Sequence, residues 1–155
     1  MAFLIRFATK EDAEDIVNIT REAFVLYKER AGAISVDALT ETRDDVINDI
    51  ENKLVFVALE NNNAVGCVRV EIKPDKTAWL TRFAVKVDSH NGGIGKKLLA
   101  RIDEVMAKNG VKSISLYTAS EVVALMSFYN SCGFEIESTD NKRGYTRSKL
   151  TKNYI

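Results

Sequence analysis

The chain has 155 residues, a length that predicts one domain, residues 1–155, with roughly two thirds of its unfolded surface buried in a single core. Lysine plus arginine (22) equals aspartate plus glutamate (22), so no broad field is available to hold a nucleic acid or an anionic membrane. Two cysteines and one histidine exclude a disulfide scaffold or structural zinc site, and no apolar run is long enough to span a membrane, so we expect a cytoplasmic protein without a metal.

The first third of the sequence predicts a strand followed by two helices. Phe3–Phe7 alternates weakly, and Thr9 can cap a helix that carries acids in its first turn. Apolar residues at three- and four-residue spacing predict that this helix runs to about Tyr27. After a loop, the same spacing predicts a second helix over Asp37–Ile50.

The middle of the chain predicts an antiparallel meander of three strands. Leu54–Ile72 is rich in β-branched and apolar residues on both sides of three consecutive asparagines, Asn61–Asn63, which predicts a hairpin that turns there. A second turn at Lys73–Lys76 leads to a strand over Thr77–Val87.

The rest of the chain alternates between helices and strands. A glycine-bearing loop over Asp88–Gly95 opens directly into an amphipathic helix. The later expected elements are that helix, ending at Asn109-Gly110, a strand over Val111–Tyr117, a helix from Ser120 to Cys132-Gly133, a strand beginning at Phe134–Ile136 and a final strand over Tyr145–Leu150. The predicted order is therefore β-α-α-β-β-β-α-β-α-β-β.

The run His90-Asn91-Gly92-Gly93-Ile94-Gly95-Lys96 is a candidate anion-binding site. It lies where a strand passes into a helix, so backbone N–H groups and the positive helix end can converge on a phosphate. The alternative is a glycine-rich turn with structural duties only. The run is neither a P-loop, because Lys97 follows Gly95-Lys96, nor a dinucleotide fingerprint, because Leu98 stands in place of the third glycine.

Together with the preceding Phe83-Ala84-Val85, this run resembles the acetyl-CoA signature of the GNAT family of N-acetyltransferases, in which Arg/Gln-x-x-Gly-x-Gly/Ala follows the fourth strand. Phe128-Tyr129 and Gly133-Phe134 are similar to the aromatic pair of that family and the Gly-Phe that starts its next strand. Two positions depart from the pattern, since His90 replaces the usual Arg or Gln and Asn91 a frequent Gly. The resemblance covers essentially the whole chain.

The resemblance implies an α/β (α+β) fold with a mixed, mostly antiparallel sheet of about seven strands and about four flanking helices. It implies that acetyl-CoA donates an acetyl group to a primary amine of a small molecule, peptide or protein in a ternary complex, that the fourth and fifth strands splay apart, and that a homodimer is possible. The implied coenzyme contacts are Phe83, Ala84, Val85 and Val87 on the strand and His90, Asn91, Gly92, Gly93, Ile94, Gly95 and Lys96 in the loop.

Acetyl transfer to an amine requires an oxyanion site, an acid for the departing thiolate and a route for proton removal. A strand N–H near Val85 is the natural oxyanion site. The resemblance implies that Tyr129 is the acid, whereas otherwise Phe128 and Tyr129 are core aromatics. The base is open: Trp79 stands where some family members place a glutamate, and Glu71 is the best alternative unless it is a solvated charge on a strand.

The sequence leaves the acceptor and two other functions open. Acids around the second helix, Glu41, Asp44, Asp45, Asp49 and Glu51, either attract a cationic amine or form a solvated helix face. A non-catalytic sensor of acyl-CoA would use the same pocket without turnover. A simple interaction domain that recruits a partner through a sheet edge would not bind the coenzyme.

Overall fold

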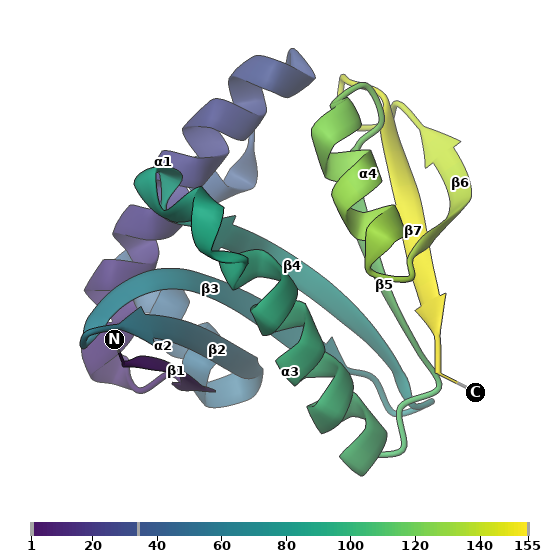
Figure 1. The fold of residues 1–155 in the computed structure, drawn as a ribbon. Coiled ribbons are helices and arrows are strands. Elements are labelled where there is room, and N and C mark those ends of the chain that lie inside the picture. Colours follow the sequence, from purple (N-terminus) through teal and green to yellow (C-terminus); the bar gives the residue numbers. More distant parts are fainter. Residues whose placement is uncertain (1, 34, 155) are drawn as a thin grey trace.

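The computed structural model describes residues 2–33 and 35–154, and of residues 89–91 it describes only the backbone. These parts contain one seven-stranded sheet with helices packed against it (Figure 1). The strands are β1 (Phe3–Phe7), β2 (Leu54–Glu60), β3 (Asn63–Ile72), β4 (Thr77–Val85), β5 (Ser113–Ala119), β6 (Glu135–Asp140) and β7 (Arg147–Asn153). The helices are α1 (Ala13–Ala31), α2 (Arg43–Asn52), α3 (Ile94–Lys108) and α4 (Val123–Ser131), with short 3-10 helices η1 (Lys10–Asp12), η2 (Asp37–Leu39) and η3 (Val87–Gly92). No helix among the described residues has the length and apolar character needed to cross a membrane.

The strand order in the sheet is β1-β2-β3-β4-β5-β7-β6. Every neighbouring pair is antiparallel except β4 and β5, which are parallel and are joined through α3. The hairpin between β2 and β3 turns at Asn61 and Asn62, whose positive φ angles of 51° and 69° suit asparagine in a tight turn. The predicted fold class and the predicted order of elements are confirmed.

Helices cover both faces of the sheet, as Figure 1 shows. On one face, α3 buries Leu98 and Ile102 against strand residues that include Val68. On the other face, α1 and α2 bury side chains such as Ile16 against Cys67. Val68 and Cys67 are consecutive on β3, and the alternation of side chains along a strand sends one residue to each core. The sheet is thus the middle layer of three.

Some predicted boundaries were wrong, for local reasons. The helix expected over Asp37–Ile50 is two elements, η2 and α2, because Thr42 starts a new helix as its N-cap. The Thr42 Oγ1 accepts the Asp45 N–H at 3.2 Å, and the Asp45 carboxylate accepts the Thr42 N–H at 2.9 Å, which forms a capping box. The strand expected to reach Val87 ends at Val85, where the chain turns into η3.

Candidate active site

The strands β4 and β5 pair over three positions and then separate, which opens the sheet (Figure 1). The last pair joins Trp79 to Ser115. This separation confirms the expected splay of the fourth and fifth strands. It contains a cavity of about 580 Å³ with walls from α1, β4, the start of α3, β5, α4 and the segment between β6 and β7. The predicted site residues in this wall are Phe83, Ala84, Val85, Val87, Gly95 and Tyr129.

A bulge in β4 shapes the wall of this cavity. Cys67 lies opposite Ala84, but two residues further along β3 Arg69 lies opposite Thr81, so β4 contains one extra residue. Arg82, within the bulge, has a φ of 53°, a left-handed conformation that costs about 1–2 kcal/mol for a residue other than glycine. Bulges bend a strand and change the direction of its side chains. The bulge therefore accompanies the departure of β4 from β5.

The predicted anion-binding loop forms η3 and the N-terminus of α3. Gly93 has a φ of 66° and links the two helices, and α3 then begins at Ile94. The first turn of α3 contains no acid, and Lys96 and Lys97 are exposed beside it. Free backbone N–H groups at the start of a helix, with its positive dipole end, suit an anion. The side chains of His90 and Asn91 lie outside the described part of the chain.

One carboxylate already contacts this loop. The Val87 N–H, at the start of η3, donates a hydrogen bond of 3.1 Å to Glu22 Oε1 on α1. Glu22 lies on α1, and the structure places its carboxylate against the loop. An anion that needs the Val87 N–H must displace this carboxylate.

Tyr129 lies in a cluster of aromatic rings beside the loop. Its ring contacts Phe83, Phe128 and Phe134 in edge-on or nearly edge-on geometries, with centroids 5.3–6.0 Å apart. The residue is 5% exposed and lines the cavity, and its hydroxyl forms no hydrogen bond with a described residue. Burial raises the pKa of this hydroxyl well above its usual value, so the group remains protonated at neutral pH.

Gly95 allows α3 to start close to these rings. A Cβ at this position would lie 3.0 Å from ring atoms of both Phe83 and Phe128. The glycine therefore brings the N-terminus of α3 and the aromatic cluster together along one side of the cavity. This contact explains why a glycine stands in the first turn of a helix that otherwise lacks one.

Two further tyrosines, Tyr27 and Tyr145, line the cavity and contact each other. The hydroxyls of Tyr27 on α1 and Tyr145, just before β7, are 2.8 Å apart. Burial and this hydrogen bond raise the pKa of Tyr27. The two residues are 118 positions apart in sequence, so no local pattern could have revealed the contact.

The base candidate Glu71 lies outside the cavity wall. It is opposite Trp79 in the β3–β4 register, but its half-exposed carboxylate pairs with Lys73 Nζ at 3.2 Å. Trp79, by contrast, lines the cavity and stacks on Tyr117 with ring centroids 5.5 Å apart. A catalytic role for Glu71 stays a prediction, and its position does not favour it.

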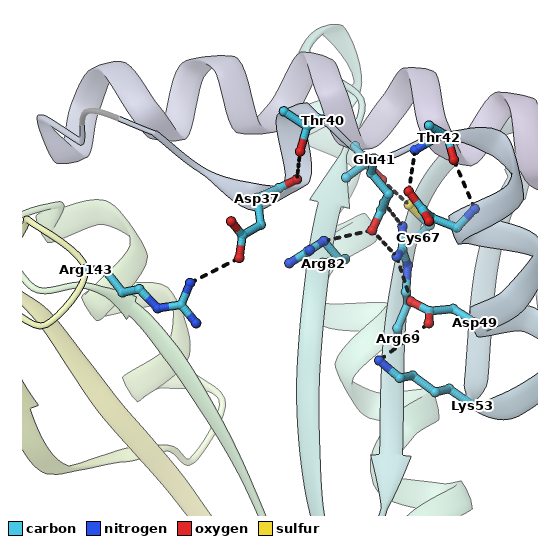
Figure 2. Close-up of polar contacts among 12 residues, drawn as sticks. Asp37, Thr40, Glu41, Thr42, Asp49, Lys53, Cys67, Arg69, Arg82 and Arg143 are labelled. Carbon is cyan, nitrogen blue, oxygen red and sulfur yellow. Dashed lines mark hydrogen bonds and ion pairs between the residues drawn. The ribbon is translucent and has the colours of Figure 1, made fainter.

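The acidic cluster has a role that the sequence analysis missed (Figure 2). Arg69 is 1% exposed, and its terminal nitrogens bind Glu41 at 2.5 and 2.7 Å and Asp49 at 2.8 Å. Glu41 also accepts from Arg82 Nε at 3.2 Å. The cluster thus neutralises a buried arginine and holds the bulge residue. The signal was available in the apolar run Val68-Arg69-Val70, where a charge interrupts a strand buried on both faces.

The sequence profile described as "Acetyltransferase (GNAT) family" matches residues 13–134, from the start of α1 to the residue before β6. The chain belongs to the GNAT acetyltransferase family. The match includes β4, η3, α3 and α4, which build the cavity. The predicted family is confirmed, and with it the enzyme class that the family name states.

Individual relatives of this GNAT chain agree with the assignment. It is similar to a probable N-acetyltransferase 14 of Xenopus tropicalis, 28% identical over 62% of the chain, and the match spans about half (47%) of the frog protein. It is also similar to an uncharacterized N-acetyltransferase, YvbK, of Bacillus subtilis, 26% identical over 66% of the chain and 67% of that protein.

Among solved structures, a PaiA N-acetyltransferase from Thermoplasma acidophilum in complex with coenzyme A covers 99% of the GNAT chain and 100% of its own length, with a TM-score of 0.85 and 25% identity. A putative acetyltransferase, YncA, from Salmonella typhimurium with acetyl-CoA has a TM-score of 0.82 and 20% identity over 100% and 95% of the two chains. The second likeness shows the fold alone.

Proposed function

We propose that this chain transfers an acetyl group from acetyl-CoA to a primary amine, with both substrates bound in the cavity at once. The observation that carries the proposal is the position of Tyr129: a protonated hydroxyl without a partner among the described residues lines the cavity beside the N-terminus of α3. Family membership and the coenzyme A bound to the T. acidophilum protein support the choice of donor.

The residues around the loop fit the coenzyme. Its diphosphate needs hydrogen-bond donors and positive charge, and the start of α3 offers backbone N–H groups with Lys96 and Lys97 nearby. Its extended arm needs a narrow path, which β4 and the rings of Phe83 and Phe128 border. The carboxylate of Glu22 then leaves the Val87 N–H, because two anions cannot share this donor at low cost.

In this proposal the contribution of the cavity side chains is proton transfer by Tyr129. Acetyl-CoA supplies a thioester, whose carbonyl carbon bonds to the amine nitrogen while its bond to sulfur breaks. Tyr129 donates its proton to the departing sulfur and recovers one from the new amide nitrogen through solvent, so that an amide and a free thiol result. Burial keeps Tyr129 protonated before each turnover, and the tyrosinate left after donation readily takes up a proton.

No side chain in the wall is an evident base. Asp37 is the one carboxylate among the described lining residues, and it pairs with Arg143 at 3.1 Å. This arrangement favours release of the ammonium proton to water, so that the amine reacts in its free form. The base at Glu71, the cytoplasmic location and the homodimer stay predictions.

The test is a thiol-release assay of the purified protein with acetyl-CoA and a panel of amines, amino acids and peptides, combined with calorimetry of coenzyme binding. We expect coenzyme A to be released only when an accepted amine is present. A sensor would bind acetyl-CoA and release no thiol with any amine, and an interaction domain would not bind it. Either result would overturn the proposal.

A further inference from the structure

Guanidinium groups dominate the charge of the cavity wall. Arg30, Arg82, Arg143 and Arg147 line it, and Asp37 is the single carboxylate in the described wall. Asp37 already pairs with Arg143. Three arginines therefore face the cavity without a carboxylate in the wall to balance them. A binding site for a simple cationic amine would have the opposite charge.

The guanidinium group of Arg82 is fixed through its Nε, and its two terminal nitrogens are available to a ligand. Its Nε donates to Glu41 at 3.2 Å, while its two terminal nitrogens form no hydrogen bond or ion pair with a described residue. Glu41 is itself fixed by the buried Arg69 (Figure 2). The left-handed φ of 53° at Arg82 is a strained conformation, and such strain gathers at functional sites.

Arg147 is held in the same way from the other side of the cavity. Its Nε is 3.4 Å from Asp140, and its guanidinium lies 3.9 Å from the centre of the Tyr117 ring. The two terminal nitrogens again have no hydrogen-bond partner among the described residues. In both arginines an ion pair and neighbouring structure fix the Nε edge and leave the pair of terminal donors that suits a carboxylate.

Arg82, Arg143 and Arg147 lie on the face of the sheet opposite the proposed diphosphate site. Arg82 and Arg143 contact Glu41 and Asp37, which flank α1 and α2. Leu150 on β7 packs into the core under α3. Side chains alternate between the two faces along a strand, so Arg147, three residues before Leu150, points to the opposite face. Their charge is thus separated from the N-terminus of α3, and it is available to the acceptor.

We propose that the acceptor amine carries an anionic group, in the simplest case a carboxylate, and that Arg82 and Arg147 bind it. The inference rests on the proposed acetyl transfer and names its substrate class. Amino acids, and peptides with an acidic residue near the reacting amine, are the compounds that fit. Of the acidic residues around α2, Glu41 and Asp49 are bound to Arg69 and so are not free to attract a cationic amine.

The test compares matched acceptors at saturating acetyl-CoA: L-phenylalanine, its primary amide and 2-phenylethylamine, with an equivalent set built on methionine. We expect kcat/KM to be at least about 10-fold higher for the acid than for its amide, a ratio that equals about 1.4 kcal/mol. The amide has the less basic amine and so a larger free-amine fraction, a bias that works against this result.

Arg82→Gln and Arg147→Gln should each lower kcat/KM for the acid at least about 10-fold and leave the KM for acetyl-CoA unchanged. Arg147→Gln keeps the test valid if loss of Arg82 disturbs the bulge. The control is Arg101→Gln, on α3 outside the cavity, whose partner Glu104 is exposed. It should behave like the wild type.

Three results would contradict the inference while leaving acetyl transfer intact: neutral or cationic amines preferred throughout, an unchanged acid-to-amide ratio in both glutamine variants, or a raised KM for acetyl-CoA as their main effect. The last would assign these arginines to the coenzyme phosphates. Absence of thiol release with every amine would instead contradict the proposed function itself.

Discussion

The ring of Tyr129 packs among other aromatic rings, while the residue lines the cavity and its hydroxyl has no hydrogen-bond partner among the described residues. Tyr129 lines the cavity, so its hydroxyl can donate a hydrogen bond to a molecule bound there. A phenylalanine in its place would pack equally well. What distinguishes the tyrosine is a hydroxyl that can donate its proton to a ligand atom in the cavity.

Tyr129→Phe should lower kcat about 100-fold or more, because general acid catalysis typically contributes a factor of that size. Coenzyme affinity should change little, since the ring and its contacts with Phe83 and Phe128 remain. Steady-state kinetics and calorimetry measure the two quantities. A variant with wild-type turnover would remove Tyr129 from the chemistry.

At the scale of elements, the turn between η3 and α3 depends on one backbone conformation. Gly93 has a φ of 66°, and a Cβ there would meet no atom within 4 Å, so the constraint is conformational and not steric. Gly92 next to it has no positive φ, and a Cβ there would make only ordinary contact with Ile94 at 3.6 Å. The two glycines form a matched pair for an experiment.

Gly93→Ala should lower the free energy of unfolding by about 1–2 kcal/mol, the cost of a left-handed conformation for an L-residue. It should also weaken coenzyme binding, because the start of α3 shifts when the turn relaxes. Gly92→Ala should change both quantities much less. Urea unfolding and calorimetry test this, and equal effects of the two substitutions would contradict the role given to Gly93.

At the scale of the whole molecule, the cavity joins two portions of the sheet that share three residue pairs between β4 and β5. The proposed coenzyme contacts both portions, since its site includes β4, the start of α3 and α4. Coenzyme A at about 100 times its Kd should therefore raise the free energy of unfolding by about 2.7 kcal/mol. Thermal unfolding with and without the coenzyme measures this change.

Hydrogen exchange shows which parts of the chain coenzyme A stabilises. Protection should increase in β4 beyond Trp79, in the first turn of α3 and in α4, and remain unchanged in β1 at the far edge of the sheet. Stabilisation without added protection around the cavity would place the coenzyme elsewhere.

The order of helices and strands could be predicted from the sequence because the main signals for them are local. Asn61–Asn63 marks a turn, the apolar spacing of α3 marks a helix, and the glycines at residues 92, 93 and 95 mark the passage between a strand and a helix. The candidate anion-binding loop follows from the glycine pattern, whereas Tyr129 was named from the family resemblance. The break at Thr42 was also local, a capping box that the apolar spacing of the helix obscured.

The acceptor side could not be predicted in this way. The bulge at Arg82 arises from a mismatch in register between β3 and β4, and the ion pairs of Arg69 join residues 20 and 28 positions apart. The Tyr27–Tyr145 contact spans 118 positions. Such features depend on how distant segments pack, which residue spacing alone does not encode.

The short β4–β5 pairing also bears on which donors this enzyme can use. Where β5 departs, an extended arm can run along β4 in place of the missing strand, and this contact involves the length of the arm and not the acetyl group it carries. A truncated thioester, such as an S-acetyl derivative of a two-carbon thiol, keeps the reactive carbonyl but lacks the arm and the diphosphate, so it loses the proposed contacts with β4 and the start of α3. Binding of the arm and the diphosphate, which lie far from the thioester bond, then determines which thioesters react.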